Sequence, residues 1–211
     1  MLSTERITEI LIHGIILLIA FPIHECAHAL VAKWLGDDTA EKQGRITLNP
    51  IKHLDLWGTI LMLFAGFGWA RPVPINPNNF KNRKFGMALS SLAGPVSNLI
   101  LAYISMILSK ILLYTEISEE LSIILINAML INVGLAIFNL LPIPPLDGSR
   151  ILLLILPEKL YFKVMKYENI IFIILFAVIW LGLLDMPLTF LQVKAIEIMS
   201  FLSGWIDMLF I

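Results

Sequence analysis

Charge and cysteine are scarce in this sequence, and both scarcities narrow the class of protein. Only 15% of the 211 residues are charged, whereas 58% are hydrophobic, and the mean hydropathy is +0.87. Such a composition is too apolar for a soluble domain of this length and is typical of a multi-pass membrane protein. The single cysteine, Cys26, excludes an internal disulfide.

Several other features are also missing. The sequence has no basic patch interleaved with aromatics, which argues against a nucleic-acid partner. It has no low-complexity tract, repeat or long polar linker, so we expect residues 1–211 to form one integral membrane domain. The first apolar stretch does not resemble a cleaved signal peptide, because residues 1–9 are not strongly basic and no small-residue cleavage site follows.

Long apolar runs predict an all-α membrane protein, a polytopic helical bundle with about five to six transmembrane segments. The five clear runs are 8–34, 87–113, 120–141, 168–184 and 189–210. A sixth run, 56–70, is short, contains three glycines and has basic residues on both flanks, which favours a re-entrant segment.

A small β element is also expected. Segments 44–48 and 71–77 are extended and limited by proline, so they could form a sheet edge. Such an edge could bind an unfolded substrate segment by strand addition, or it could pack only on its own protein.

The distribution of basic residues predicts the orientation in the cell membrane. Twelve of the fifteen lysine and arginine residues fall in segments that this topology places on one side. By the positive-inside rule that side is cytoplasmic, so we expect the N-terminus outside and the C-terminus in the cytoplasm.

Residues 24–28 spell H-E-x-x-H inside the first apolar run. On a helix, residues four apart return to the same face, so His24 and His28 can bind one metal ion and Glu25 can reach a water beside it. Ionisable groups in hydrocarbon cost several kcal/mol unless they are paired, coordinated or hydrated, and are therefore read as functional. By its place in the run, this motif lies nearer the cytoplasmic face.

Two other interpretations of the motif stay open. The histidines could donate to carbonyls of neighbouring helices while Glu25 pairs with a basic group. Cys26 could pack as a small residue, or, less simply, compete as a thiolate ligand.

A catalytic zinc site usually has three protein ligands, and Asp147 is the best third candidate. It lies in N-L-L-P-I-P-P-L-D-G, residues 139–148, where three prolines forbid a regular helix. Non-helical backbone at membrane depth is tolerated where it lines a cavity. The alternative role of Asp147 is the N-cap of a short helix over 151–156.

Together with A-G-P-V-S-N at 93–98, these motifs resemble the site-2 protease family of intramembrane zinc metalloproteases. The resemblance covers about residues 10–156. It implies one zinc ion per chain bound by His24, His28 and Asp147, with Glu25 as the catalytic base. It makes Asn139 a candidate for holding substrate or an oxyanion. The chain has no room for the PDZ or CBS domains of some members.

We therefore expect an intramembrane zinc metalloprotease that hydrolyses peptide bonds within or near transmembrane segments of membrane-protein or peptide substrates, as in regulated intramembrane proteolysis. The catalytic core would cover about 8–156, with C-terminal helices over about 168–210. A membrane metal-ion transporter and a non-catalytic membrane scaffold are the alternatives, and the sequence does not fix the oligomeric state.

Three further polar residues have less specific signals. Asn98 could reach the site or bond a neighbouring helix. His53 could be an alternative ligand, but it lies in a basic loop. His13 is about three turns from His24, too far to share a metal.

Overall fold

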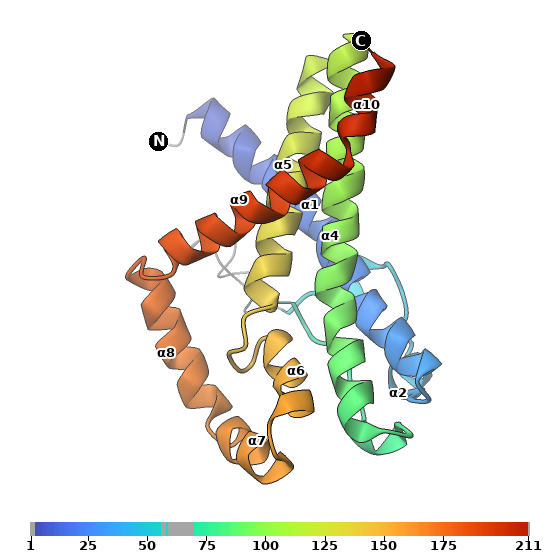
Figure 1. Cartoon of the computed structure of the whole chain (residues 1–211), viewed down its shortest axis with the longest axis vertical. Helices are drawn as coiled ribbons and strands as arrows, with labels where there is room; N and C mark the ends of the chain where they lie inside the picture. Colours follow the sequence, from blue (N-terminus) through green and yellow to red (C-terminus); the bar gives the residue numbers. More distant parts are fainter. Residues whose placement is uncertain (1–2, 56–57, 59–69, 211) are drawn as a thin grey trace.

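The computed structural model describes residues 3–55, 58 and 70–210. Within those ranges the chain is built of helices and loops, and the β structure consists of one isolated antiparallel bridge between Leu54 and Ala70. Three long helices, α1, α4 and α5, form the centre of the molecule (Figure 1).

Each long helix begins at a polar N-cap residue. The helices are α1 (Thr4–Trp34), α4 (Arg83–Thr115) and α5 (Glu119–Asn139), and the side chains of Ser3, Asn82 and Ser118 accept a backbone N–H from the first turn of each. All three are long and apolar enough to cross a membrane, so the first, second and third clear runs of the sequence are confirmed as helices of that kind.

The connections hold shorter elements. Between α1 and α4 lie α2 (Thr39–Lys42), η1 (Pro50–Lys52) and η2 (Pro77–Asn79). After α5 come α6 (Gly148–Ile155), α7 (Glu158–Met165), α8 (Glu168–Trp180), α9 (Asp185–Leu202) and α10 (Gly204–Leu209).

The last two apolar runs do not form two straight spans. Helix α8 has 13 residues, about 20 Å of helix, which is shorter than the roughly 30 Å hydrocarbon layer. Together with Asp185–Leu209 it passes as one broken span, bent by 85°. The described residues therefore supply three candidate spans, or four with this pair, and the count of five to six is not confirmed.

Both ends of the chain lie at the same end of the molecule. Asp207 in α10 accepts hydrogen bonds from Lys110 Nζ at 2.9 and 3.0 Å, and the rings of Tyr114 and Phe210 stack at 5.1 Å. These contacts hold the C-terminus beside the last turns of α4 (Figure 1). The first half of α1 lies at the same end, because His13 contacts Asn127 in the first half of α5. The prediction that the termini lie on opposite sides of the membrane is therefore not supported, because α8 and Asp185–Leu209 together pass at most as one broken span.

The expected re-entrant segment at 56–70 lies almost wholly outside the described residues. The expected β element is not formed, because neither 44–48 nor 71–77 is a strand. The bridge between Leu54 and Ala70 lies outside both segments, and beside it Arg71 N donates to the His53 carbonyl at 2.7 Å. Prolines at 72, 74 and 77 remove backbone donors, which is why 71–77 stays extended without becoming a strand.

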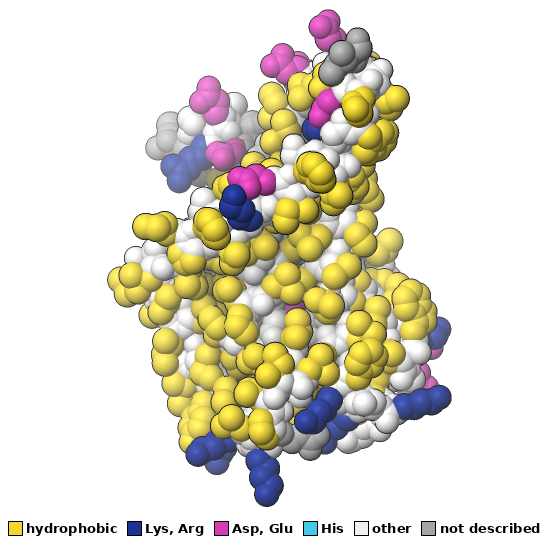
Figure 2. All heavy atoms as spheres, in the orientation of Figure 1, with side chains coloured by type: hydrophobic (Ala, Val, Ile, Leu, Met, Phe, Trp, Pro, Cys, Tyr) yellow, Lys and Arg dark blue, Asp and Glu magenta, His cyan; other side chains and the backbone are white. Residues whose placement is uncertain are grey.

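Apolar side chains cover the outer faces of the long helices, as expected for a protein that lipid surrounds (Figure 2). Inside, a buried cluster joins α4, α5 and α9 through Ala102, Met106, Met129, Val133 and Met199. In Figure 2 most basic side chains gather at the end that carries α2 and α7, and most acidic ones at the end with the termini. The site described next lies between α1, α4 and the loop before α6.

Candidate metal centre

The two histidines of the H-E-x-x-H motif meet on one face of α1. Their Nε2 atoms are 3.0 Å apart, and their rings lie edge to face with centroids at 4.6 Å. Both side chains are buried, with 6% of His24 and 5% of His28 exposed. The helical spacing predicted from the sequence therefore brings the two imidazoles to a single point.

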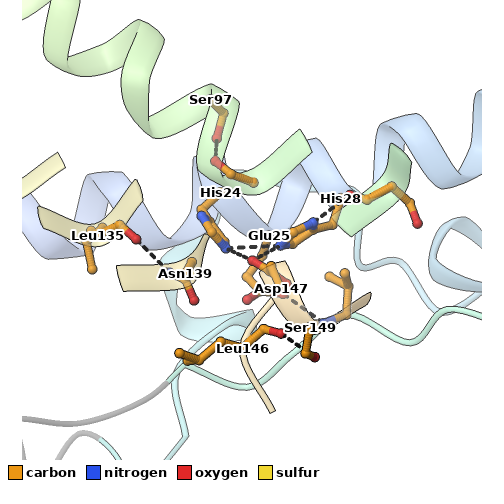
Figure 3. A network of polar contacts seen from close by, with 12 residues as sticks. His24, Glu25, His28, Ser97, Leu135, Asn139, Leu146, Asp147 and Ser149 are labelled. Carbon is orange, nitrogen blue, oxygen red and sulfur yellow. Dashed lines mark hydrogen bonds and ion pairs between the residues drawn. The ribbon is translucent and has the colours of Figure 1, made fainter. Parts of the chain in front are cut away.

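Asp147 approaches the same point from the loop before α6 (Figure 3). Its Oδ2 atom lies 3.2 Å from Nε2 of His24 and 3.2 Å from Nε2 of His28. Asp147 occupies the N-cap position of α6, but its side chain makes no capping hydrogen bond. The carboxylate therefore faces the histidines, and the capping role considered from the sequence is wrong.

The hydrogen bond of the His28 ring indicates which of its two nitrogens faces the other ligand atoms. Nδ1 of His28 lies 2.7 Å from the Ser90 carbonyl, and a carbonyl can only accept, so this nitrogen carries the proton. In the neutral ring Nε2 then presents a lone pair toward His24 Nε2 and Asp147 Oδ2. Lone pairs that converge in a buried place repel one another unless a proton or a cation lies among them.

The dimensions fit a zinc ion. The ligand atoms of His24, His28 and Asp147 all lie within 4.8 Å of one another. Tetrahedral ligands at 2.0–2.1 Å from zinc are about 3.3 Å apart, close to the separations of 3.0 and 3.2 Å found here. Asp147 Oδ2 and His24 Nδ1 are buried without a hydrogen-bond partner in the described part of the chain. The donor set of two imidazoles and a carboxylate is one that zinc favours.

Burial opposes the negative charge of Asp147, but the two adjacent histidines outweigh that effect and hold the pKa of its carboxyl below the usual range. The group is therefore an anion at neutral pH. A buried carboxylate beside two imidazole nitrogens is a donor set that a divalent cation can compensate.

Two glycines make this convergence sterically possible. A Cβ built on Gly94 in α4 would lie 2.5 Å from Cε1 of His28 and 2.6 Å from Cε1 of His24. A Cβ on Gly148 would lie 2.5 Å from the Leu140 carbonyl carbon and 2.5 Å from the Leu141 carbonyl oxygen. Real Cβ contacts are not that short, so α4 can lie against the histidines, and the start of α6 against the end of α5, only at glycine.

Glu25 is held by a segment that sequence reasoning did not connect with the motif. Its Oε2 atom accepts the backbone N–H of Val73 at 2.8 Å, and 8% of the residue is exposed. Val73 and Ser90 both act through the backbone, one by its N–H and the other by its carbonyl. Their side chains therefore gave no signal of this role.

The remaining candidates make other contacts and do not join the His24–His28–Asp147 group. Asn139 is near it in Figure 3, but its amide nitrogen donates to the Leu135 carbonyl at 3.0 Å, within α5. His53 contacts the Thr47 carbonyl at 2.8 Å, and His13 contacts Asn127 at 3.2 Å. Cys26 is a buried free thiol.

Asn98 is fully buried in α4, one turn beyond Gly94. In the described part of the chain neither atom of its amide group has a hydrogen-bond partner. The structure therefore supports neither a bond to a neighbouring helix nor a direct contact with the histidines.

Comparisons with known proteins identify the family of the chain. A model of peptidase family M50 matches residues 111–182. The candidate zinc metalloprotease YwhC of Bacillus subtilis (strain 168) is 48% identical over 171 residues, which are 77% of this chain and 78% of the relative. The candidate zinc metalloprotease Rip2 of Mycolicibacterium smegmatis is 32% identical over 136 residues, 62% of this chain and 52% of the relative.

Rip2 of Mycobacterium tuberculosis (strain H37Rv) is 29% identical over 135 residues, again 62% of this chain and 52% of the relative. No solved structure matches the chain. The match with YwhC covers more than three quarters of both proteins. The chain thus belongs to peptidase family M50, the site-2 protease family of zinc metalloproteases.

Proposed function

We propose that this metalloprotease hydrolyses peptide bonds within or near the transmembrane segments of membrane-protein substrates, the reaction of regulated intramembrane proteolysis. The observation that carries the proposal is the convergence of Asp147 on His24 and His28, which lie inside a helix that is long and apolar enough to span a membrane. Three buried ligand atoms with a glutamate next in sequence match the parts that metal-assisted hydrolysis needs.

In this proposal His24, His28 and Asp147 hold one zinc ion per chain. When bound, zinc supplies a Lewis acid that polarises a carbonyl and lowers the pKa of a coordinated water. The Ser90 carbonyl keeps the His28 ring oriented, with Nε2 free for the metal. Gly94 keeps the space in front of both rings clear of any side chain.

Glu25 acts as general base and then as general acid. The Val73 amide holds Oε2 at 2.8 Å, which leaves Oε1 to take a proton from the attacking water. Glu25 then returns this proton to the leaving amine as the peptide bond breaks. Because the Glu25 carboxylate is buried, it interacts more strongly with the charges that develop during proton transfer than it would in water.

The substrate must be unwound before it can be cut. A helical membrane segment uses its own amide groups in internal hydrogen bonds, so substrates with Gly, Pro or Asn in the span are preferred. Asn139 is one helical turn from Leu135, to which it donates, and release of that bond frees its amide for substrate or an oxyanion.

We further propose that residues 1–211 form a single integral domain, with the catalytic core over about 8–156 and the C-terminal helices over about 168–210. The end that carries the basic loops faces the cytoplasm, by the positive-inside rule. Both termini then face the opposite side. The metal centre lies nearer the cytoplasmic end, where water can reach it.

A Glu25→Gln variant tests the proposed function. The probe is a tagged single-span reporter whose apolar helix is interrupted by an Asn-Gly pair, incubated with the purified protein in detergent. We expect normal zinc content with cleavage reduced at least a hundredfold, because the amide cannot accept the proton. The matched control is Glu41→Gln, which alters an exposed glutamate paired with Lys33.

Unchanged cleavage by Glu25→Gln would overturn the protease mechanism. Zinc transport into vesicles that Glu25→Gln leaves intact, with no cleavage by either protein, would favour a metal-ion transporter. A protein with neither activity would favour the scaffold.

A further inference from the structure

The segment at 71–76 reaches Glu25 through a single residue. Val73 donates its N–H to Glu25 Oε2, and its side chain packs in a buried cluster with Ala29 and Ala40. Ala29 lies four residues after Glu25, on the same face of α1. Val73 therefore fits across one turn of the helix, and its position determines where the glutamate carboxylate points.

Arg45 fixes the segment just before Val73. Its guanidinium Nη2 donates to the Arg71 carbonyl at 2.7 Å and to the Pro72 carbonyl at 3.2 Å. Only 8% of Arg45 is exposed. Arginine offers several donors in a rigid plane, so one side chain can hold two successive carbonyls and set the direction of the chain that enters Val73.

Asp37 fixes the segment just after Val73. Its carboxylate accepts the Asn76 backbone N–H at 2.7 Å and the Asn79 side-chain amide at 2.7 Å, and it also accepts two bonds from Thr39. Asp37 is 1% exposed and lies just beyond the end of α1. The helix that carries Glu25 is thereby connected at its end to the segment that holds the Glu25 side chain.

These contacts form one path from two buried charges to the proposed base. We propose that Arg45 and Asp37 are positioning residues that hold the 71–76 segment so that the Val73 amide orients Glu25 for proton transfer. The inference rests on the proposed function, because it needs Glu25 to act on the substrate. Arg45 and Asp37 do not touch the His24–His28–Asp147 group.

The cost of burying these charges supports a role in function. A buried ion pair or charge is weak support for stability, because its desolvation offsets much of the interaction. Arg45 donates to neutral carbonyls, and its Nε has no partner in the described part of the chain. Burial lowers the pKa of Arg45, and the nearby Glu25 carboxylate opposes that shift. The cation is thus close enough to Glu25 to interact with its charge.

The test uses Arg45→Gln and Asp37→Asn in the purified full chain, with the single-span reporter as probe. For both we expect zinc content unchanged and kcat lowered about 10- to 100-fold with little change in KM, the size typical for loss of a partner that orients a catalytic group. Arg45→Lys keeps a donor and is expected to restore part of kcat. The controls Lys42→Gln and Asp38→Asn remove an exposed ion pair that lies close in sequence to both residues.

A second pair of variants separates orientation from folding. Val73→Pro deletes the N–H that Glu25 accepts, whereas Val73→Ala keeps that N–H and removes part of the packing. We expect Val73→Pro to lose kcat as Arg45→Gln does, and Val73→Ala to lose clearly less than Val73→Pro because it keeps the N–H. Equal loss in the two variants would mean that only packing matters and would overturn the inference.

The activities of the Glu25, Arg45 and Asp37 variants separate the positioning role from the proposed function. Inactive Glu25→Gln together with wild-type kcat in Arg45→Gln and Asp37→Asn overturns the positioning role alone. A raised KM with unchanged kcat assigns the segment to substrate binding and also overturns it. Wild-type activity of Glu25→Gln overturns the proposed function itself.

Discussion

Gly94 and His28 are in van der Waals contact across the α1–α4 interface, and His28 occupies the space that a side chain at 94 would need. A Cβ there would be 2.5 Å from His28 Cε1. One turn earlier in α4, the Ser90 carbonyl lies 2.7 Å from the other nitrogen of the same ring. Helix α4 therefore determines both the position and the rotation of the imidazole.

Replacement of Gly94 by alanine should displace both histidine rings. Because the added methyl would overlap His24 as well as His28, we expect the zinc affinity to fall at least tenfold and the stability by about 1 to 3 kcal/mol. The measurement is zinc titration of the purified variant together with its thermal unfolding in detergent.

Gly134→Ala is the matched control for that experiment. Gly134 also lies inside a long helix, but among the described residues outside that helix a Cβ there would meet only Gln192 Nε2, at 3.7 Å. We expect unchanged zinc affinity and a gain of up to about 1 kcal/mol from the better helix propensity of alanine. Equal zinc affinity in the two alanine variants would refute the steric role of Gly94.

Gly148→Ala should move Asp147 away from the histidines. The new Cβ would overlap backbone atoms of Leu140 and Leu141, and backbone cannot turn aside as a flexible side chain can. We expect loss of zinc binding with most helix content retained, as measured by metal analysis and circular dichroism. Gly14→Ala is the control, because among the described residues a Cβ at that glycine would have no atom within 4 Å apart from the backbone of its own helix. Zinc retention by Gly148→Ala at the level of the control would contradict the prediction.

The stability supplied by Asp37 should depend on pH. Burial raises the pKa of its carboxyl, but bonds from Thr39, Asn76 and Asn79 outweigh this and lower it. A lowered pKa adds stability that is fully present above the ordinary value of about 3.9 and is lost as the pH falls through the folded-state value. At pH 7 we expect Asp37→Asn to be less stable than the original protein by about 1.5 to 3 kcal/mol.

Thermal unfolding of both proteins at several pH values checks this sign. The difference between them should be constant from pH 7 to about pH 5 and shrink below about pH 4. A difference that grows as the pH falls would show that the charged form of Asp37 is not the stabilising one.

The sequence predicts the long helices and the pairing of the two histidines, because both depend on local patterns of residues. The apolar runs predicted α1, α4 and α5, and helical periodicity placed His24 beside His28. Asp147 is predicted as their partner because zinc usually has a third protein ligand, and because the three prolines before Asp147 indicate non-helical backbone that lines a cavity. The structure brings these three residues together, and their role as zinc ligands stays a prediction.

The contacts that orient Glu25 and His28 could not be predicted from the sequence, because they join distant segments, partly through backbone atoms. Val73 and Ser90 act through main-chain atoms, which every residue type possesses. Arg45 and Asp37 have no motif around them, and only the fold brings both to one loop. The break near Gly182, which has a φ of +69°, lies inside the predicted run 168–184, and the number of spans depends on the 85° bend that follows it.

The most direct test of the account is the zinc content of the purified protein and of its Asp147→Ala and His28→Ala variants, with His13→Ala as control because His13 lies on the same helix beside Asn127. We predict one zinc ion per chain in the original protein and in His13→Ala, and none in the other two after dialysis. One tightly held zinc ion per chain in Asp147→Ala would contradict the metal centre described here.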